Sequence, residues 1–278
     1  MALYDDLLRK LDEKAFLAFK VWDFSFRSLL HRYGSAFLKG VVFQHPLRTL
    51  SGLLTYRRLV HVDCKRGDIT YLFSGTEENF RRRVAEGEGD FLVAVGFCQK
   101  PMREAGHGNE CPVGRFNHCC LYLAQLDFSQ PEGKCTPSVC QSCEIRMIAT
   151  RALHAGADMH IMTSAMDILH DIFVPSLERR RFKTAILCVC PYSVQPMALP
   201  LLICGIESLV VQFDSGHCAD YSQWTLADRG IKDDRTLLSS QAYSKILDFL
   251  DGVAALRTEM EKPPHHRFQL EGNIYVPV

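Results

Sequence analysis

The chain has 278 residues, with 32 basic and 32 acidic side chains. Its length allows a substantial buried core that needs no disulfide or metal support. The balanced charge excludes a sequence-wide cationic field, so nucleic acid is not an expected partner.

Twelve cysteines are more than a chain of this size ordinarily carries. The first residues lack the basic and then apolar pattern of a secretory leader, so we expect reduced thiols in a cytoplasmic protein and no disulfide framework. Reduced thiols bind metal, act in catalysis or are buried as small apolar side chains. No apolar run reaches the roughly 18 residues of a membrane-spanning helix.

Residues 1–60 predict an amphipathic, aromatic-rich helical segment, followed by a cysteine-rich α/β iron–sulfur domain over 61–278. Four aromatic side chains recur at spacings of three and four, which places them on one helix face: Phe16, Phe19, Trp22 and Phe26. Such a face suits packing on the main core. A peripheral membrane contact or a homodimer contact is the alternative, because Lys and Arg flank the aromatic residues.

The remainder alternates between apolar runs and amphipathic helices. Strands are predicted at 69–73, 91–97, 160–162, 184–189 and 208–213, and helices at 76–85, 144–154, 166–180, 194–203 and 241–257. This alternation predicts an α/β fold with a small, mainly parallel sheet and flanking helices. The loop over 99–136 shows little periodicity, and a loop of that length is usually functional or held by something other than packing.

Residues that directly follow the predicted strands should meet at one edge of the sheet. They are Cys98, Thr163, Ser164, Cys190, His217 and Cys218. Open parallel sheets bind ligands beyond the carboxyl ends of their strands, so we expect a small-molecule pocket there. Ser164 and His217 are candidate catalytic residues in it, and Arg115 is a candidate for holding an anionic substrate. Solvent-exposed surface side chains are the alternative for His217 and Arg115.

The cysteine spacing predicts metal binding. Two thiolates separated by two residues, as in Cys140-x2-Cys143, can bind one metal centre. Cys143 also opens a predicted helix, whose free N–H groups would stabilise an anionic cluster. One centre is predicted from Cys135, Cys140 and Cys143 with Cys190 or Cys218, and a second from Cys98, Cys111, Cys119 and Cys120.

One or two iron–sulfur clusters, of the 4Fe–4S type, are favoured over zinc. Zinc sites commonly show two paired knuckles, whereas most cysteines here are spread singly. Cys188 and Cys204 lie in apolar runs and are predicted to be buried core residues, and Cys64 lies in a basic loop.

Four motifs occur in a recognisable order: Cys135-x4-Cys140-x2-Cys143-Glu-Ile-Arg, Met162-Thr-Ser-Ala-Met-Asp-Ile, Cys190-Pro-Tyr-Ser and Asp214-Ser-Gly-His-Cys218. They resemble a cysteine-rich prokaryotic domain family, found largely in anaerobes and sometimes linked to lipoate ligase-like domains. The resemblance covers about Cys98 to Thr236. It implies metal binding in an anaerobic context and supplies no reaction or substrate.

These patterns favour an iron–sulfur enzyme in which one iron lacks a cysteine ligand and acts on a small-molecule substrate by dehydration, desulfuration or reduction. One alternative is an electron-transfer or cluster-carrier module that docks to a redox partner protein. Another is a zinc-stabilised structural protein. The GxGxxG signature of dinucleotide binding follows none of the predicted strands.

Overall fold

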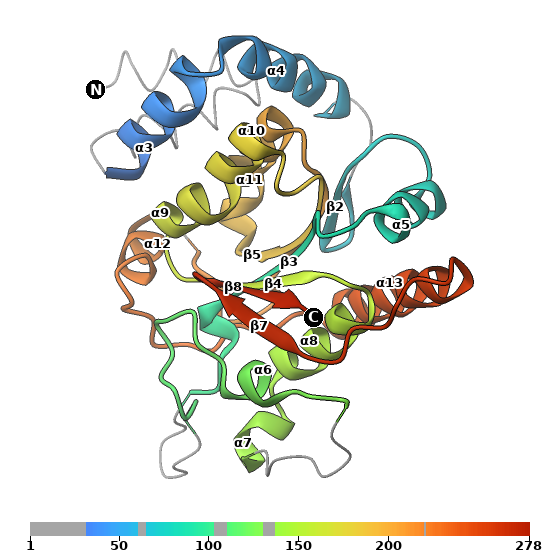
Figure 1. Cartoon of the computed structure of the whole chain (residues 1–278). Helices are drawn as coiled ribbons and strands as arrows, with labels where there is room; N and C mark the ends of the chain where they lie inside the picture. Colours follow the sequence, from blue (N-terminus) through green and yellow to red (C-terminus); the bar gives the residue numbers. More distant parts are fainter. Residues whose placement is uncertain (1–31, 61–64, 103–109, 130–136, 220) are drawn as a thin grey trace.

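The computed structural model describes residues 32–60, 65–102, 110–129, 137–219 and 221–278. Within them an eight-stranded sheet has the order β1-β2-β6-β5-β3-β4-β8-β7 (Figure 1). Its four central strands run parallel: β6 (Glu207–Gln212), β5 (Thr184–Val189), β3 (Phe91–Gly96) and β4 (Asp158–Met162). The prediction of an α/β fold with a mainly parallel sheet is confirmed.

Antiparallel strands extend the sheet at both edges. On one side β2 (Ile69–Leu72) pairs with β6, and β1 (Lys65–Arg66) pairs with β2. On the other side a hairpin of β7 (Phe268–Glu271) and β8 (Ile274–Pro277) pairs with β4 through β8. The sequence analysis does not predict this hairpin. Its signal is the two-residue turn Gly272-Asn273, in which Gly272 has φ +62 as tight hairpin turns require.

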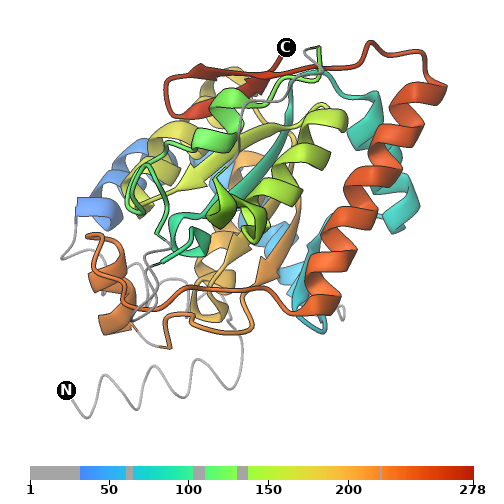
Figure 2. The same cartoon turned by 90° about the horizontal axis from the view of Figure 1, so that it is seen from below.

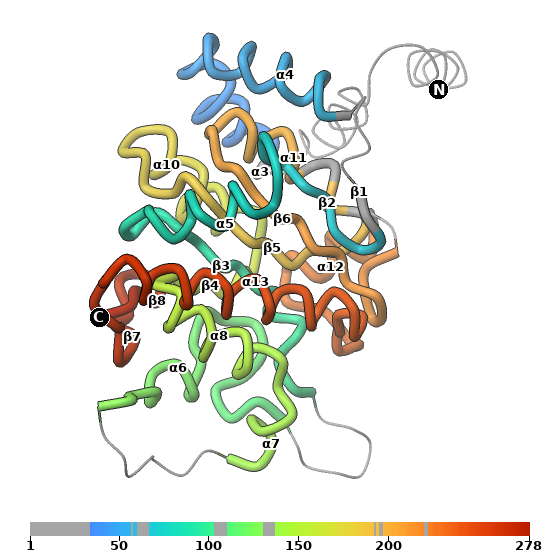
Figure 3. Tube along the Cα trace, turned by 90° about the vertical axis from the view of Figure 1, so that its right-hand side faces the viewer, coloured from blue at the N-terminus to red at the C-terminus, as the bar shows by residue number. Residues whose placement is uncertain are grey.

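Helices cover both faces of the sheet, as predicted. One face carries α5 (Glu77–Glu86), α8 (Glu144–His154) and α13 (Ser240–Glu259), and Figure 2 shows α13 lying beside α5. The other face carries α4 (Pro46–Val60), α11 (Pro191–Cys204) and the run α9 (Ala165–Ile168), η3 (Leu169–Phe173) and α10 (Val174–Arg179). Figure 3 shows α4 outermost over α11, and α8 and α13 beyond the sheet.

The strand sequences explain why both faces are covered. All six residues of β3 are buried. Val93 and Val95 pack into the core on the α8 and α13 side, whereas Leu92 and Ala94 pack into the core on the α11 side. Successive side chains of a strand point to opposite faces, so a continuous apolar run requires a helix layer on each side.

Local sequence explains several helix ends. Ser164 and Asp167 form the capping box that starts α9. Gly205 ends α11 with φ +73, a left-handed conformation that favours glycine. Cys143 is the N-cap of α8.

The described part of the N-terminal segment is helical, with α3 (Arg32–Phe37) and η1 (Leu38–Phe43) before α4. Helix α4 approaches α11 closely at Gly52, where an added Cβ would lie 2.6 Å from Ile203 Cγ1. The aromatic face predicted from Phe16 to Phe26 lies outside the described residues. Every helix in the described part of the chain is too short or too polar to cross a lipid bilayer.

Phe80 lies fully buried between α5, α13 and the end of β2. Its ring stacks on Phe73 with centroids 4.3 Å apart and lies 5.5 Å from the ring of Phe249. We expect Phe80→Ala to lower the free energy of unfolding by about 3–5 kcal/mol, because the ring leaves a cavity. The control is Phe43→Ala, whose side chain is 72% exposed and should change stability by less than about 0.5 kcal/mol. Urea denaturation measures both, and equal losses would contradict the packing described here.

Candidate functional site

A cavity of ≈ 110 Å³ lies at the carboxyl ends of the four parallel strands. Its wall includes Cys98 after β3, Thr163 and Ser164 after β4, Cys190 after β5 and Cys218 after β6. The predicted convergence of these residues is therefore confirmed. Since one water molecule occupies about 30 Å³ in the liquid, the cavity suits a ligand of only a few heavy atoms.

Four cysteines line this cavity. We call three of them, Cys98, Cys190 and Cys218, the cavity cysteines, because each lies just beyond the end of a strand. The fourth, Cys188, lies within β5 and is 1% exposed. The Cys218 backbone N–H donates to Cys190 Sγ over 3.3 Å. A hydrogen bond from the Cys218 side chain lowers the pKa of Cys190, whereas burial raises the pKa of Cys98. Cys190 thus ionises more readily than Cys98.

Lys232 supplies a positive charge at the same cavity. It lines the wall, and its side chain is 7% exposed. Its ion-pair partner Asp234 is 76% exposed, and the pair is long at 3.9 Å. The lysine charge acts to lower the pKa of both Cys98 and Cys190. A buried ammonium next to a small cavity favours an anionic ligand.

A second set of thiols lies outside the cavity, in the loops around α6 (Leu121–Gln125) and α7 (Ser138–Gln141). We call Cys111, Cys120, Cys140 and Cys143 the rim cysteine group. Burial raises the pKa of Cys120, Cys140 and Cys143, and charge on Cys111 raises the pKa of each of them further. The four sulfur atoms therefore lie close enough to interact as charges.

Two thiols of this group lie at helix N-termini. Cys120 is the N-cap of α6, and the backbone N–H groups of Leu123 and Tyr122 act to lower the pKa of its thiol. Cys143 is the N-cap of α8, and the N–H groups of Ile145 and Arg146 act on its thiol in the same direction. Burial nevertheless dominates, and it raises the pKa of Cys120 to about 11. A metal would make both sulfurs thiolates, which these N–H groups and the helix dipole of α8 stabilise.

Lys100 lies within the same loops and is 2% exposed. Its Nζ donates to the Asn117 carbonyl, Asn117 Oδ1 and the Cys119 carbonyl over 2.8 Å each, and to the Gly114 carbonyl over 3.3 Å. No carboxylate of the described residues pairs with it. Burial lowers the pKa of Lys100, and negative charge on Cys111, Cys120, Cys119 and Cys143 would raise it. The buried ammonium therefore favours anionic sulfur beside it.

The spacing of the sulfur atoms discriminates between one zinc ion and a cluster. Four thiolates around zinc, each about 2.3 Å from the metal, lie roughly 3.8 Å apart. In the described part of the chain, no three cysteine sulfurs lie within 4.8 Å of one another. A four-iron cluster binds each sulfur to a different iron and so keeps the sulfurs farther apart. In the described residues, the rim cysteine group therefore does not form the close set of sulfurs that a single zinc ion requires.

The structure groups the cysteines differently from the sequence-based assignment. Cys98 lies with Cys190 and Cys218, and Cys111 and Cys120 lie with Cys140 and Cys143. Cys119 is exposed beside the rim cysteine group. Cys135 and Cys64 lie outside the described residues. The predicted burial of Cys188 and Cys204 is confirmed, at 1% and 4% exposure.

Arg115 is held by backbone carbonyls. Its guanidinium donates to the carbonyls of Lys232, Asp234 and Cys98, over 2.8, 2.9 and 3.2 Å. These bonds fasten the cysteine loop to the segment that carries Lys232, and Arg115 does not line the cavity. His217 is also absent from the cavity wall, and its Nδ1 faces the Cys218 carbonyl at 3.4 Å. Ser164 lines the cavity and caps α9.

The two sets of cysteines are connected through their neighbours in sequence. Gln99 follows Cys98 and Glu144 follows Cys143, and Gln99 Nε2 donates to Glu144 Oε2 over 3.1 Å. Glu144 is also bonded to the Leu238 backbone N–H, and burial raises its pKa. The cavity and the rim cysteine group therefore share one hydrogen-bonded wall.

The sequence analysis misses several polar residues of this region, namely Lys100, Lys232, His160 and Asp171. The signal for His160 is a single histidine in the apolar strand Met159-His-Ile-Met162. Comparison of the chain with models of protein families, with curated proteins and with solved structures finds no match. The resemblance of its cysteine motifs to a prokaryotic family therefore stays a prediction.

The substitution Lys100→Met removes a buried hydrogen-bond donor, so that four oxygen atoms of the loop lose their hydrogen bonds to Nζ. We expect the free energy of unfolding to fall by about 3 kcal/mol, because unsatisfied buried groups each cost about 1–3 kcal/mol. The control is Lys183→Met, since Lys183 is 62% exposed and makes one ion pair with Asp90 over 2.7 Å. That change should cost less than about 1 kcal/mol. Similar losses in urea denaturation would mean that Lys100 does not hold the loop.

Proposed function

We propose that the chain is an iron–sulfur enzyme in which the rim cysteine group holds a 4Fe–4S cluster and the adjoining cavity binds a small anionic substrate. The observation that carries this proposal is the buried Lys100 ammonium among cysteine thiols, without a carboxylate partner in the described residues. An anionic cluster would supply the missing negative charge.

The chain's own residues have distinct parts in this proposal. The N–H groups at the starts of α6 and α8 hold two of the thiolates, and Lys100 balances their charge. Lys232 attracts and orients the anion in the cavity, and the apolar walls there exclude water. When bound, the rim cluster would supply an electron, because its four cysteines leave no iron open as a Lewis acid. The reaction we propose is dehydration, desulfuration or reduction of the bound anion.

The cavity cysteines allow a second centre in the same proposal. A cluster held by these three, with the buried Cys188 of β5 left unbound, would have one iron free of cysteine facing the cavity. A reducing compartment such as the cytoplasm suits either arrangement, because all ten described cysteines are free thiols.

Electron transfer to a redox partner protein is the second candidate. It is favoured by the position of the rim cysteine group at the surface, where Cys119 is exposed and Cys111 and Cys120 are half-buried. The partly open, largely apolar cavity beside the thiols favours the enzyme, because a pure electron carrier has no need of a ligand site.

Iron content tests the cluster. We expect anaerobically purified protein to be brown, with absorption near roughly 400 nm from iron–sulfur charge transfer. Cys140→Ala and Cys143→Ala should each abolish the rim cluster, because each removes a thiolate ligand. Cys204→Ala, at a buried core position on the other face, should keep the wild-type iron.

Iron and acid-labile sulfide are measured in all three variants. Equal loss in all of them would mean that the changes act through folding. Colourless wild-type protein without iron or sulfide would remove the proposal.

Ligand binding tests the enzyme against the electron carrier. We expect small carboxylates to perturb the EPR spectrum of the reduced cluster, and neutral amides of the same size to have less effect, because Lys232 is cationic. Lys232→Met should weaken the carboxylate effect at least tenfold in concentration. Lys245→Met, an exposed lysine on α13, is the control. A spectrum that no ligand changes would favour electron transfer.

A further inference from the structure

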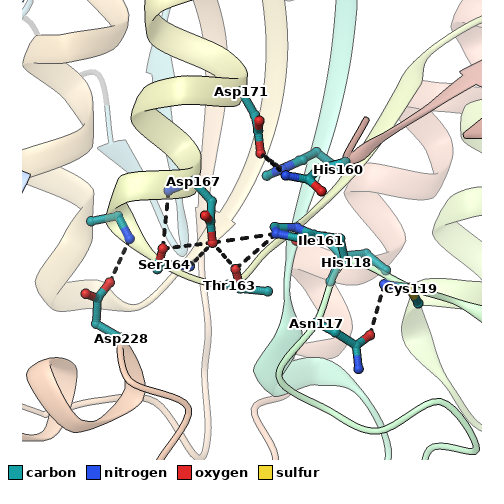
Figure 4. A network of polar contacts seen from close by, with 12 residues as sticks. Asn117, His118, Cys119, His160, Ile161, Thr163, Ser164, Asp167, Asp171 and Asp228 are labelled. Atoms are coloured by element: carbon teal, nitrogen blue, oxygen red, sulfur yellow. Dashed lines mark hydrogen bonds and ion pairs between the residues drawn. The ribbon is translucent and has the colours of Figure 1, made fainter. Parts of the chain in front are cut away.

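A third group of metal-ligand side chains lies on the β8 side of the cavity, apart from both sets of cysteines. His118, His160 and Asp171 each offer one ligand atom, and these three atoms lie within 4.8 Å of one another. In the described part of the chain, no other group of three His, Cys, Asp or Glu residues meets this condition. Figure 4 shows the three side chains converging, with Asp167 and Thr163 next to them.

The fold fixes which nitrogen His118 presents. Its Nδ1 lies 2.8 Å from the Ile161 carbonyl. Because a carbonyl only accepts, Nδ1 carries the proton, and the lone pair of the neutral ring is on Nε2. Nε2 faces Thr163 Oγ1 at 3.4 Å and Asp167 Oδ2 at 3.6 Å. A backbone carbonyl on one ring nitrogen is the usual way in which proteins orient a metal-binding histidine.

His160 comes from β4 and is fully buried. Its Nε2 lies 3.1 Å from Asp171 Oδ2, and its Nδ1 has no hydrogen-bond partner. Nε2 is the ring nitrogen that faces Asp171, so a metal there would take the Nε2 lone pair and leave the ring proton on Nδ1, for which no described group competes.

Asp171 is held in place for the same centre. It lies in η3, a π-helical turn of the kind often found at functional sites. Asn273 Nδ2, from the turn of the β7–β8 hairpin, donates to Asp171 Oδ2 over 3.0 Å. This bond fixes the orientation of the Asp171 carboxylate toward His160.

The local charge also favours a cation. Two carboxylates, Asp171 and Asp167, face two histidines, and their side chains are only 20% and 33% exposed. Asp167 is further held by Ser164 Oγ at 2.8 Å and by Thr163. With neutral histidines the group has a net charge of −2, which a divalent ion would neutralise.

The distances are compatible with a tetrahedral ion. Ligand atoms about 2.1 Å from such a metal lie roughly 3.4 Å apart. The His160–Asp171 pair already meets that spacing, and His118, on a loop, needs to move by about 1 Å. Two histidines with one carboxylate are typical of zinc and of ferrous iron, and both ions then keep positions open for water or substrate.

We propose that His118, His160 and Asp171 bind one divalent transition-metal ion, zinc or ferrous iron, with Asp167 next to its open positions. Thr163 separates the ion from the cavity, because it lines the cavity and faces His118 Nε2. The centre is independent of the rim cysteine group and gives the cavity a second cationic boundary opposite Lys232.

Cobalt binding to the full chain tests this proposal. Anaerobic protein is equilibrated with Co²⁺ and desalted, and bound cobalt is measured by elemental analysis. We expect His118→Ala and Asp171→Asn each to bind one Co²⁺ per chain fewer than the wild type. The matched control is His170→Gln, an exposed histidine in the same π-helical turn, which should bind as the wild type does. Zn²⁺ added in excess should displace the same single equivalent.

A second variant separates this centre from the cysteines. Cys140→Ala/Cys143→Ala should lose thiolate-to-cobalt charge-transfer absorption and keep the extra equivalent. Circular dichroism checks that each variant folds. His118 and Asp171 lie on different elements, so if one of these two variants fails to fold, the other decides the result. Any one of three results would overturn the proposal. They are wild-type cobalt stoichiometry in a folded His118 or Asp171 variant, loss of the ion in His170→Gln, and no cobalt bound by the double cysteine variant.

Discussion

The parallel direction of β6, β5, β3 and β4 is the constraint on which the candidate sites depend. Each strand ends at the same edge, so the residue that follows it is delivered there regardless of the length of the intervening helix. Cys98, Cys190 and Cys218 lie far apart in the sequence and still line one cavity. The helix layers on both faces make this arrangement rigid, because every residue of β3 and every residue of β5 is buried between them.

Charge balance is the second theme. The chain has no net charge, yet two lysines are buried beside thiols, Lys100 at the rim cysteine group and Lys232 at the cavity. The opposite imbalance occurs at Asp167 and Asp171, where carboxylates gather around histidines. Uncompensated buried charge is costly. The regions around Lys100 and Lys232 therefore favour anionic sulfur and an anionic ligand, whereas the region around Asp167 and Asp171 favours a cation.

Much of this was predictable from sequence because periodicity reports which faces are buried. The central strands, the helices α5, α8 and α13, and the Ser164–Asp167 cap follow from local patterns. The hairpin β7–β8 was missed because each of its strands has only four residues, so that the alternation in Phe268-Gln-Leu-Glu271 is too short to stand out. The grouping of the cysteines into two sets was also missed. Spacing along the chain does not reveal the hydrogen bond between Gln99 and Glu144, which lies between Cys98 of one set and Cys143 of the other. His160 was hidden in a strand, where polar residues are usually inconspicuous.

The β7–β8 hairpin touches two of these sites at once. Tyr275 accepts a hydrogen bond at its hydroxyl from the Cys120 backbone N–H over 2.8 Å, and Asn273 in the turn holds Asp171. Ribosomes synthesise these residues after every other part of both sites. The earlier segments can therefore pack into their layers during translation. The loop of Cys120 and the carboxylate of Asp171 gain their hydrogen bonds to the hairpin only after β8 has been synthesised and has paired with β4. Both candidate sites are thus completed only after the hairpin has been synthesised.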